Sequence, residues 1–138
     1  MGLHDKYGKL IMGMAAGGAY NDSGYSTRVS LGNQSFASID GTVGTDIAVE
    51  IESRVSKQVR GAVLDLVLHE YPRKLLVLLP VHMNNPNRTV AQCVFILDRF
   101  LPREDFQVTL LKGHGGDSRI EVDTLIVKLA LETLGFDC

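Results

Sequence analysis

The sequence predicts an α/β domain in which helices flank both faces of a mixed central β-sheet. Segments with helical spacing of apolar residues alternate with short strand-like segments over residues 47–138. A hairpin signal, Gly32-Asn33, precedes this alternation. The apolar run at residues 75–81 does not alternate, which is typical of a strand buried on both faces of a sheet. Together these observations favour a sheet with both antiparallel and parallel pairs.

The first part of the chain predicts one helix and three strands. Apolar residues at helical spacing indicate a helix that begins near Leu3 and ends at Gly17-Gly18. Strands are expected at residues 25–31 and 34–43, on either side of the hairpin signal. A third strand is expected at residues 47–53, where apolar residues recur with a period of two.

The second part of the chain predicts three helices that alternate with two strands. The first helix covers residues 56–70, and the buried strand at 75–81 follows it. Capping-box spacing predicts that the next helix opens at Thr89. A strand is expected at residues 106–111, and a second capping box at Ser118 opens the last helix.

Composition indicates one globular domain over residues 1–138. Of these residues, 45% are hydrophobic and 22% charged, with a net charge of −2. A nucleic-acid ligand would therefore need a local basic patch. The two cysteines, Cys93 and Cys138, are expected to be reduced in a cytoplasmic protein. The N-terminal segment is interpreted as an amphipathic helix rather than a signal peptide, and no run has the length of a membrane span.

Two glutamates in the strand at residues 47–53 are the most informative feature. Alternation places Glu50 and Glu52 on one face of a strand that is otherwise apolar. Adjacent carboxylates repel each other and resist burial. Asp40 ends the preceding strand, so the three acids meet if the strands are neighbours. Because hard cations prefer carboxylate oxygens, these three acids predict a site for Mg²⁺ or Mn²⁺.

One further acid is weighed beside these three. Asp46 is an alternative to Asp40, since it lies close before Glu50, but it stands at the strand entry, where acids are ordinary turn residues. The histidines do not have the spacing of a metal site.

These segments resemble the PD-(D/E)XK nuclease superfamily, whose fold is restriction-endonuclease-like with an αβββαβ core. The resemblance rests on an N-terminal helix, a hairpin with Ile39-Asp40-Gly41, a strand with Val49-Glu50-Ile51-Glu52 and a helix that opens with Lys57-Gln58. It covers roughly residues 1–81, and the remainder by element order alone.

The resemblance implies a role for each of these polar residues. Asp40 matches the first metal-binding acid and Glu50 the second. Glu52 stands where the superfamily usually has a lysine, so its motif is a D…ExE variant. Lys57 would be a lysine that has migrated to the following helix, and Gln58 matches a glutamine found early in that helix in exonuclease-like members. The first helix faces the active site in many members, which makes Asp5 a candidate fourth acid.

The function expected from this resemblance is Mg²⁺-dependent endonuclease activity on DNA, with RNA less favoured. A metal ion at the acids would activate water for phosphodiester hydrolysis, and a nearby cation would offset charge in the transition state. A homodimer is expected. The candidate phosphate contacts are all arginines: Arg28, Arg54, Arg60, Arg73 and Arg88.

Two alternatives stay open. The first is a non-catalytic module on the same fold that binds nucleic acid or a protein through the same cleft. The second is an interaction protein without a site, in which Glu50 and Glu52 lie on a solvent face and pair with Arg54 and Lys57.

Overall fold

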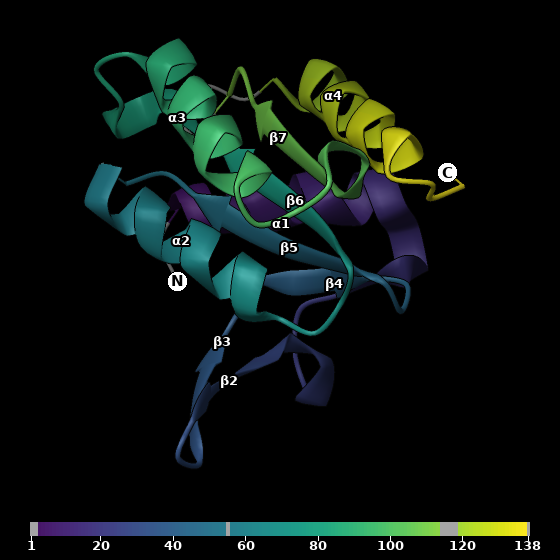
Figure 1. The fold of residues 1–138 in the computed structure, drawn as a ribbon. Coiled ribbons are helices and arrows are strands. Elements are labelled where there is room, and N and C mark those ends of the chain that lie inside the picture. The colour runs from purple at the N-terminus through teal and green to yellow at the C-terminus, as the bar shows by residue number, and fades with distance from the viewer. Residues whose placement is uncertain (1–2, 55, 114–118, 138) are drawn as a thin grey trace.

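The central sheet is mixed, as the sequence predicts. The computed structural model describes residues 3–54, 56–113 and 119–137. Within them, five strands form a sheet in the order β1-β4-β5-β6-β7, where β1, β4 and β5 pair antiparallel and β5, β6 and β7 pair parallel (Figure 1). The strands are Tyr20–Asn21, Gly41–Val43, Ile47–Glu52, Arg73–Leu78 and Phe106–Leu110.

Helices cover both faces of this sheet. Helices α2 (Ser56–Leu68) and α3 (Pro86–Asp98) lie on one face, in front of the sheet in Figure 1. Helices α1 (Leu3–Ala16) and α4 (Ile120–Thr133) pack together on the other face. No helix in the described part of the chain has both the length and the apolar character that crossing a bilayer requires.

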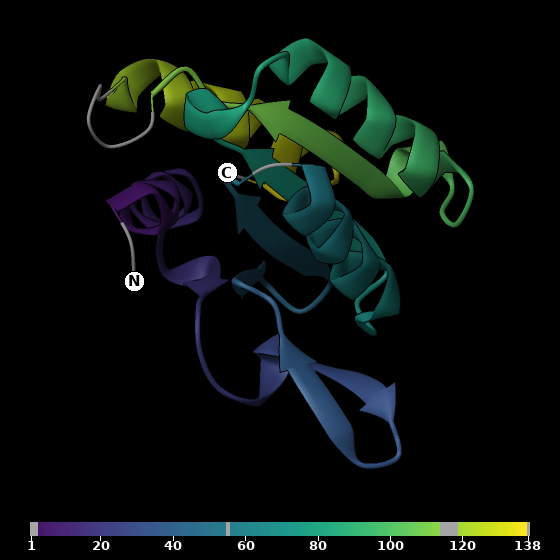
Figure 2. The ribbon, with the colours of Figure 1, turned by 90° about the vertical axis from the view of Figure 1, so that its left-hand side faces the viewer.

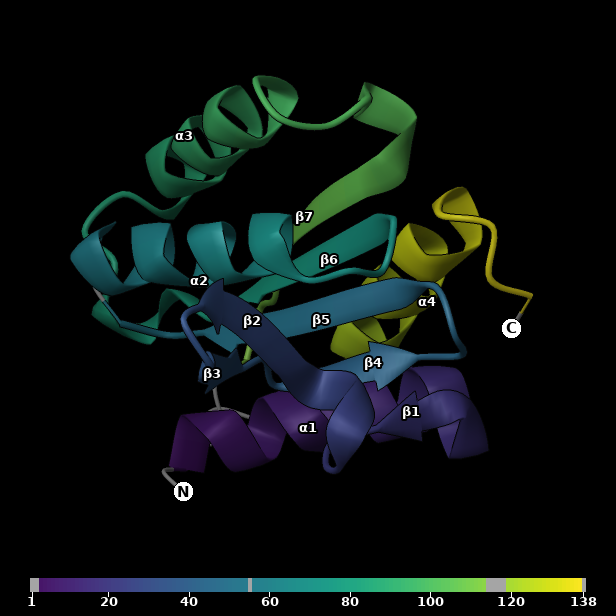
Figure 3. The ribbon, with the colours of Figure 1, turned by 60° about the horizontal axis from the view of Figure 1, so that its bottom comes forward.

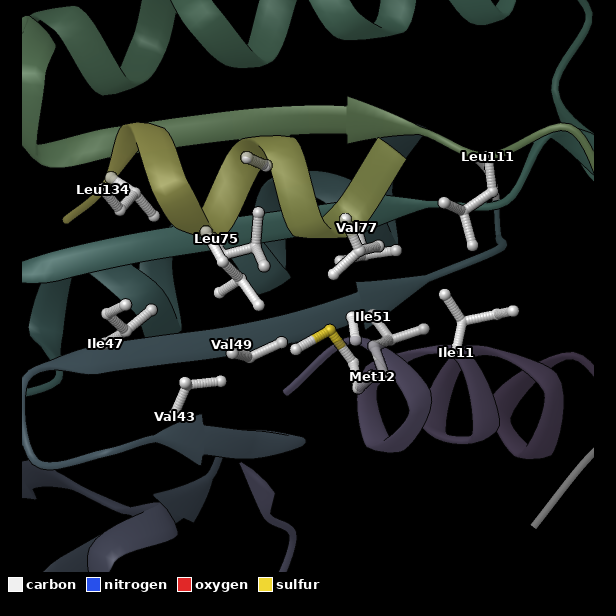
Figure 4. Close-up of a cluster of buried hydrophobic side chains, with 14 of the residues drawn as sticks. Ile11, Met12, Val43, Ile47, Val49, Ile51, Leu75, Val77, Leu111 and Leu134 are labelled. Atoms are coloured by element: carbon white, nitrogen blue, oxygen red, sulfur yellow. The ribbon is translucent and has the colours of Figure 1, made fainter. Parts of the chain in front are cut away.

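Strand alternation divides the buried side chains into two cores. Val49, Ile51 and Val77 point toward α1 and α4 (Figure 4). Ala48 and Leu76 point the opposite way, toward α2 and α3. Strand β6 contributes to both cores, which explains its continuous apolar run.

The strand predicted at residues 34–43 is divided between two sheets. Strands β2 (Arg28–Gly32) and β3 (Ser35–Ser38) form a separate hairpin, which Figure 2 shows projecting from the domain. Its turn lies at Asn33 and Gln34, both with positive φ. The hairpin lies on the α2 side of the sheet (Figure 3), where the chain leaves it at buried Ile39 and continues into β4.

Helix α3 begins four residues before the predicted position, because its N-cap is Asn85 rather than Thr89. The side chain of Asn85 accepts a hydrogen bond from the backbone N–H of Arg88 over 3.1 Å, and Pro86 follows as the first helical residue. Asparagine at the N-cap and proline at the next position are both favourable, so they override the capping box at Thr89. The capping box at Ser118 lies outside the described residues.

A buried aspartate joins α1, α4 and the chain after β7. Asp123 has no exposed surface. Its carboxylate accepts hydrogen bonds from the backbone N–H groups of Lys112 (2.7 Å) and Gly113 (2.9 Å) and from the hydroxyl of Tyr7 (2.6 Å). These bonds connect three separate elements and compensate for removing the carboxylate from water.

Candidate functional site

Strand register brings Asp40 and Glu50 together. Gly41 pairs with Val49 in the antiparallel β4–β5 ladder, so Asp40 lies opposite Glu50. The backbone N–H of Asp40 donates to Oε1 of Glu50 over 2.8 Å. The backbone N–H of Ile51 donates to Oδ2 of Asp40 over 2.7 Å. Backbone N–H groups in and beside the strands therefore position both carboxyl groups.

Glycine at position 41 is required by the packing around this pair. The Tyr20 hydroxyl donates to the backbone oxygen of Asp40 over 3.2 Å, and a Cβ at Gly41 would collide with the Tyr20 ring. Burial, assisted by the charge of Asp40, raises the pKa of the Tyr20 hydroxyl. Tyr20 therefore acts as a neutral donor next to the two acids.

The environment of the Asp40–Glu50 pair favours its protonated form. Only 8% of Glu50 is exposed. Burial, together with the negative charge of Asp40, raises the pKa of Glu50 to about 10. Burial also raises the pKa of Asp40, although the hydrogen bond from Ile51 opposes this change. Without a cation, the pair therefore retains a proton at neutral pH.

The pair opens onto an acidic cavity of about 350 Å³ at the carboxyl end of β5. Five acidic side chains line it: Asp5, Asp40, Glu50, Glu52 and Asp65. Among the described lining residues, Arg54 is the only one with a cationic side chain. An excess of carboxylates around a polar cavity favours a bound cation.

Glu52 is turned toward Arg54. Its Oε2 accepts from the backbone N–H groups of Ser53 and Arg54 and from Nε of Arg54, each over 2.9 Å. Its Oε1 accepts from Nη2 of Arg54 over 2.7 Å. Burial opposes ionisation, but the hydrogen bonds and charge of Arg54 hold the pKa of Glu52 below its usual range. Glu52 is thus an ionised carboxylate whose oxygens already have donors.

Two of the three predicted metal ligands are therefore in direct contact, and the third is paired with an arginine. In residues 3–54, 56–113 and 119–137, no three histidine, cysteine, aspartate or glutamate side chains are arranged to hold a metal ion. The role of Glu52 as a third ligand stays a prediction.

The other predicted site residues lie outside the cavity. Lys57 and Gln58 are exposed in the first turn of α2. Arg28 lies on the hairpin, where its guanidinium stacks 4.0 Å from the centroid of the Phe36 ring. Arg60 lines a different cavity, between α2 and α3.

Asp46 is not among the described residues that line the acidic cavity. It precedes β5 at the end opposite the cavity, where a carboxylate oxygen lies 3.9 Å from Nε of Arg73. This arrangement agrees with its interpretation as a turn residue.

Asp65 is the cavity residue that sequence reasoning missed. It lies on α2, and burial raises its pKa. The sequence does contain a signal for Asp65, because it lies between the buried residues Ala62 and Leu66. An acid that borders the apolar stripe of a helix points toward the sheet. Asp5, the candidate fourth acid, does line the cavity.

No family model, curated protein or solved structure matches this chain. The side chains and their geometry are therefore the basis for inferring its function.

The raised pKa of Glu50 predicts how stability depends on pH. Above pH 4.5, the ordinary pKa of the group, an unfolded chain releases the proton that the folded chain retains up to about pH 10. Since the folded state binds more protons in this window, the contribution of Glu50 to the unfolding free energy falls as pH rises. Thermal unfolding with EDTA from pH 5 to pH 9 should show wild type losing stability relative to Glu50→Gln. A difference that does not change with pH would contradict the assignment.

Proposed function

We propose that this protein is a divalent-cation-dependent nuclease that hydrolyses phosphodiester bonds in DNA. The observation that carries the proposal is the Asp40–Glu50 pair, two buried carboxyl groups held by β4 and β5 at the edge of an acidic cavity. Such a pair is costly to bury unless a proton or a cation neutralises it.

The fold supports this proposal through its element order. Helix α1 is followed by the three antiparallel strands β1, β4 and β5 of the central sheet, then by α2 and the parallel strand β6. This order agrees with the αβββαβ core of the restriction-endonuclease-like fold, and the hairpin would be an insertion between β1 and β4. We therefore propose that the chain has this core.

The carboxylates fit Mg²⁺ or Mn²⁺. Mg²⁺ usually keeps several waters and is held by one or two carboxylates together with substrate phosphates. Asp40 and Glu50 would hold the ion in place of the proton that they share without it. Glu52 would become a third ligand when Arg54 no longer donates to one of the Glu52 carboxylate oxygens.

The metal ion, when bound, supplies a Lewis acid and lowers the pKa of a coordinated water. The protein groups then have separate tasks. Arg54, whose side chain is 66% exposed at the cavity, would contact a substrate phosphate. Lys57, in the first turn of α2, would offset charge that develops on the phosphate, and Gln58 would support it.

A non-catalytic binding module is the second candidate function. The observation that favours it is the Glu52–Arg54 pair, which occupies the position where the superfamily usually has a lysine. Among the described residues that line the cavity, none is a lysine. Such a module would bind nucleic acid at the same cleft without cleaving it.

Metal titration and cleavage separate the two functions. Calorimetry with Mn²⁺ should show site-specific heat for wild type and for Asp46→Asn, the matched control at the opposite end of β5. Asp40→Asn should lose that heat. Wild type should also cleave DNA in Mn²⁺ and not in EDTA. Metal binding without cleavage would favour the binding module, and no metal binding would exclude the nuclease.

Removing Arg54 should strengthen metal binding. In Arg54→Ala the carboxylate of Glu52 loses its ion-pair partner and becomes free to act as a ligand. Only 5% of the Glu52 side chain is exposed, so the change leaves a buried carboxylate without its cation, and affinity for Mn²⁺ should rise by at least about fivefold. Calorimetry would measure this change, with Arg54→Lys as the charge-conserving control. Weaker metal binding in Arg54→Ala would contradict the role given to Glu52.

A further inference from the structure

A second cavity lies between α2 and α3, the two helices that Figure 1 shows side by side on one face of the sheet. It has a volume of about 430 Å³, within the range of small-ligand sites. Buried Val59 and Cys93 and half-buried Ile96 form apolar walls. Phe95 also lines the cavity, and 65% of this residue is exposed. We call this cavity the α2–α3 groove.

The charged side chains of the groove are cationic. Arg60 on α2 and Arg88 on α3 line it, and none of its described lining residues is acidic. In the part of the chain that the structure describes, neither guanidinium belongs to an ion pair. An adjoining cavity of about 280 Å³ shares Arg88 and likewise has no acid among its described lining residues. This polarity contrasts with the acidic cavity and with the net charge of −2.

The α2–α3 groove extends from the edge of the sheet at which the acidic cavity lies to Phe95, close to the end of α3. Parallel strands β5 and β6 precede α2 and α3, so both helices begin at the carboxyl edge, where Glu52 ends β5. Ligands of open α/β sheets bind at this edge, and helix N-termini favour anions. Val59 and Arg60 lie near the start of α2, only a few residues after Arg54 at the acidic cavity. A polyanion with a phosphate at Arg54 would therefore reach the groove along the first turns of α2.

We propose that the α2–α3 groove binds an unpaired nucleotide of a nucleic-acid strand that continues into the acidic cavity. The base would stack on Phe95 against the apolar walls, and Arg60 and Arg88 would contact the flanking phosphates. A ligand with a flat apolar part and an anionic part matches the apolar walls, the exposed Phe95 ring and the cations of the groove. The inference rests on the proposed function, because it takes the strand at the acidic cavity as its ligand.

Binding of a fluorescein-labelled single-stranded oligonucleotide of twelve thymidines, measured by fluorescence anisotropy with EDTA, tests the groove without cleavage. Phe95→Ala should weaken binding about five- to a hundredfold, as expected for the loss of one stacked base. Phe100→Ala, which removes another exposed phenylalanine close to the end of α3, is its control and should bind as wild type. Arg88→Glu should weaken binding at least about tenfold. Arg103→Glu changes net charge equally at the opposite edge of the sheet and should have a smaller effect.

Several outcomes would overturn the inference. Wild type that does not bind the oligonucleotide, or groove variants that bind it as wild type does, would exclude a nucleotide site. A different result would assign the groove to a second copy of the chain. In that case Phe95→Ala would bind the oligonucleotide as wild type does but would no longer self-associate in analytical ultracentrifugation. Failure of the nuclease proposal has a different signature, namely oligonucleotide binding that depends on the groove without Mn²⁺-dependent cleavage. Circular dichroism of each variant verifies its fold.

Discussion

Replacing Glu50 with glutamine is expected to abolish Mn²⁺ binding and, in the same variant, to stabilise the protein at pH 8. The amide cannot become an anionic ligand, so affinity for the metal should fall by at least about a hundredfold. Its oxygen still accepts the hydrogen bond from Asp40 N–H, which is 2.8 Å long in wild type. Because the amide is neutral without taking up a proton on folding, the unfolding free energy in EDTA at pH 8 should rise by about 1 kcal/mol or more.

Calorimetry with Mn²⁺ and urea denaturation in EDTA measure the two effects separately. Glu104→Gln is the matched control, because Glu104 is exposed in the turn before β7 at the opposite edge of the sheet. It should bind metal as wild type does, with stability within about 0.5 kcal/mol. A purely structural role for Glu50 predicts a different pattern. Glu50→Gln would then lose stability, and neither Glu50→Gln nor Glu104→Gln would change the heat of Mn²⁺ binding.

The largest loss of stability is expected for Asp123→Ala. This change removes the carboxylate that accepts hydrogen bonds from the backbone N–H groups of Lys112 and Gly113 and from the hydroxyl of Tyr7. A buried donor that loses its partner costs about 1–3 kcal/mol, so the unfolding free energy should fall by about 3–5 kcal/mol. Urea denaturation followed by circular dichroism measures this change.

Three further variants separate the hydrogen bonds from other effects of the change. Tyr7→Phe removes one hydroxyl and should cost about 1–2 kcal/mol. Asp123→Asn keeps one acceptor oxygen and should fall between Tyr7→Phe and Asp123→Ala. Glu121→Ala, at an exposed position two residues before Asp123 in α4, should change stability by no more than about 0.5 kcal/mol. Equal losses for Asp123→Ala and Glu121→Ala would show that the hydrogen-bonded connection is not what stabilises this region.

Regular periodicity accounts for the elements that the sequence predicts correctly. Strand β5 alternates and β6 is apolar from Leu75 to its end at Leu78, so their identity follows from the side chains alone. The division of residues 34–43 between β3 and β4 has no comparable signal. It depends on Ile39, which packs into the core beneath α2 and redirects the chain. At the start of α3, two valid capping signals compete, and the one at Asn85 is used.

The site shows the same division between local pattern and tertiary packing. Alternation along β5 places Glu50 and Glu52 on one face, and the antiparallel connection places Asp40 opposite Glu50. The first relation follows from the sequence, because side chains along a strand alternate with a fixed period, whereas the second depends on the register between β4 and β5 in the folded chain. Tertiary structure decided that Asp65 joins the cavity and that Glu52 pairs with Arg54 while Asp40 and Glu50 share a proton. The protonation and orientation of each carboxylate depend on burial and on donors from several elements, which only the folded chain brings together.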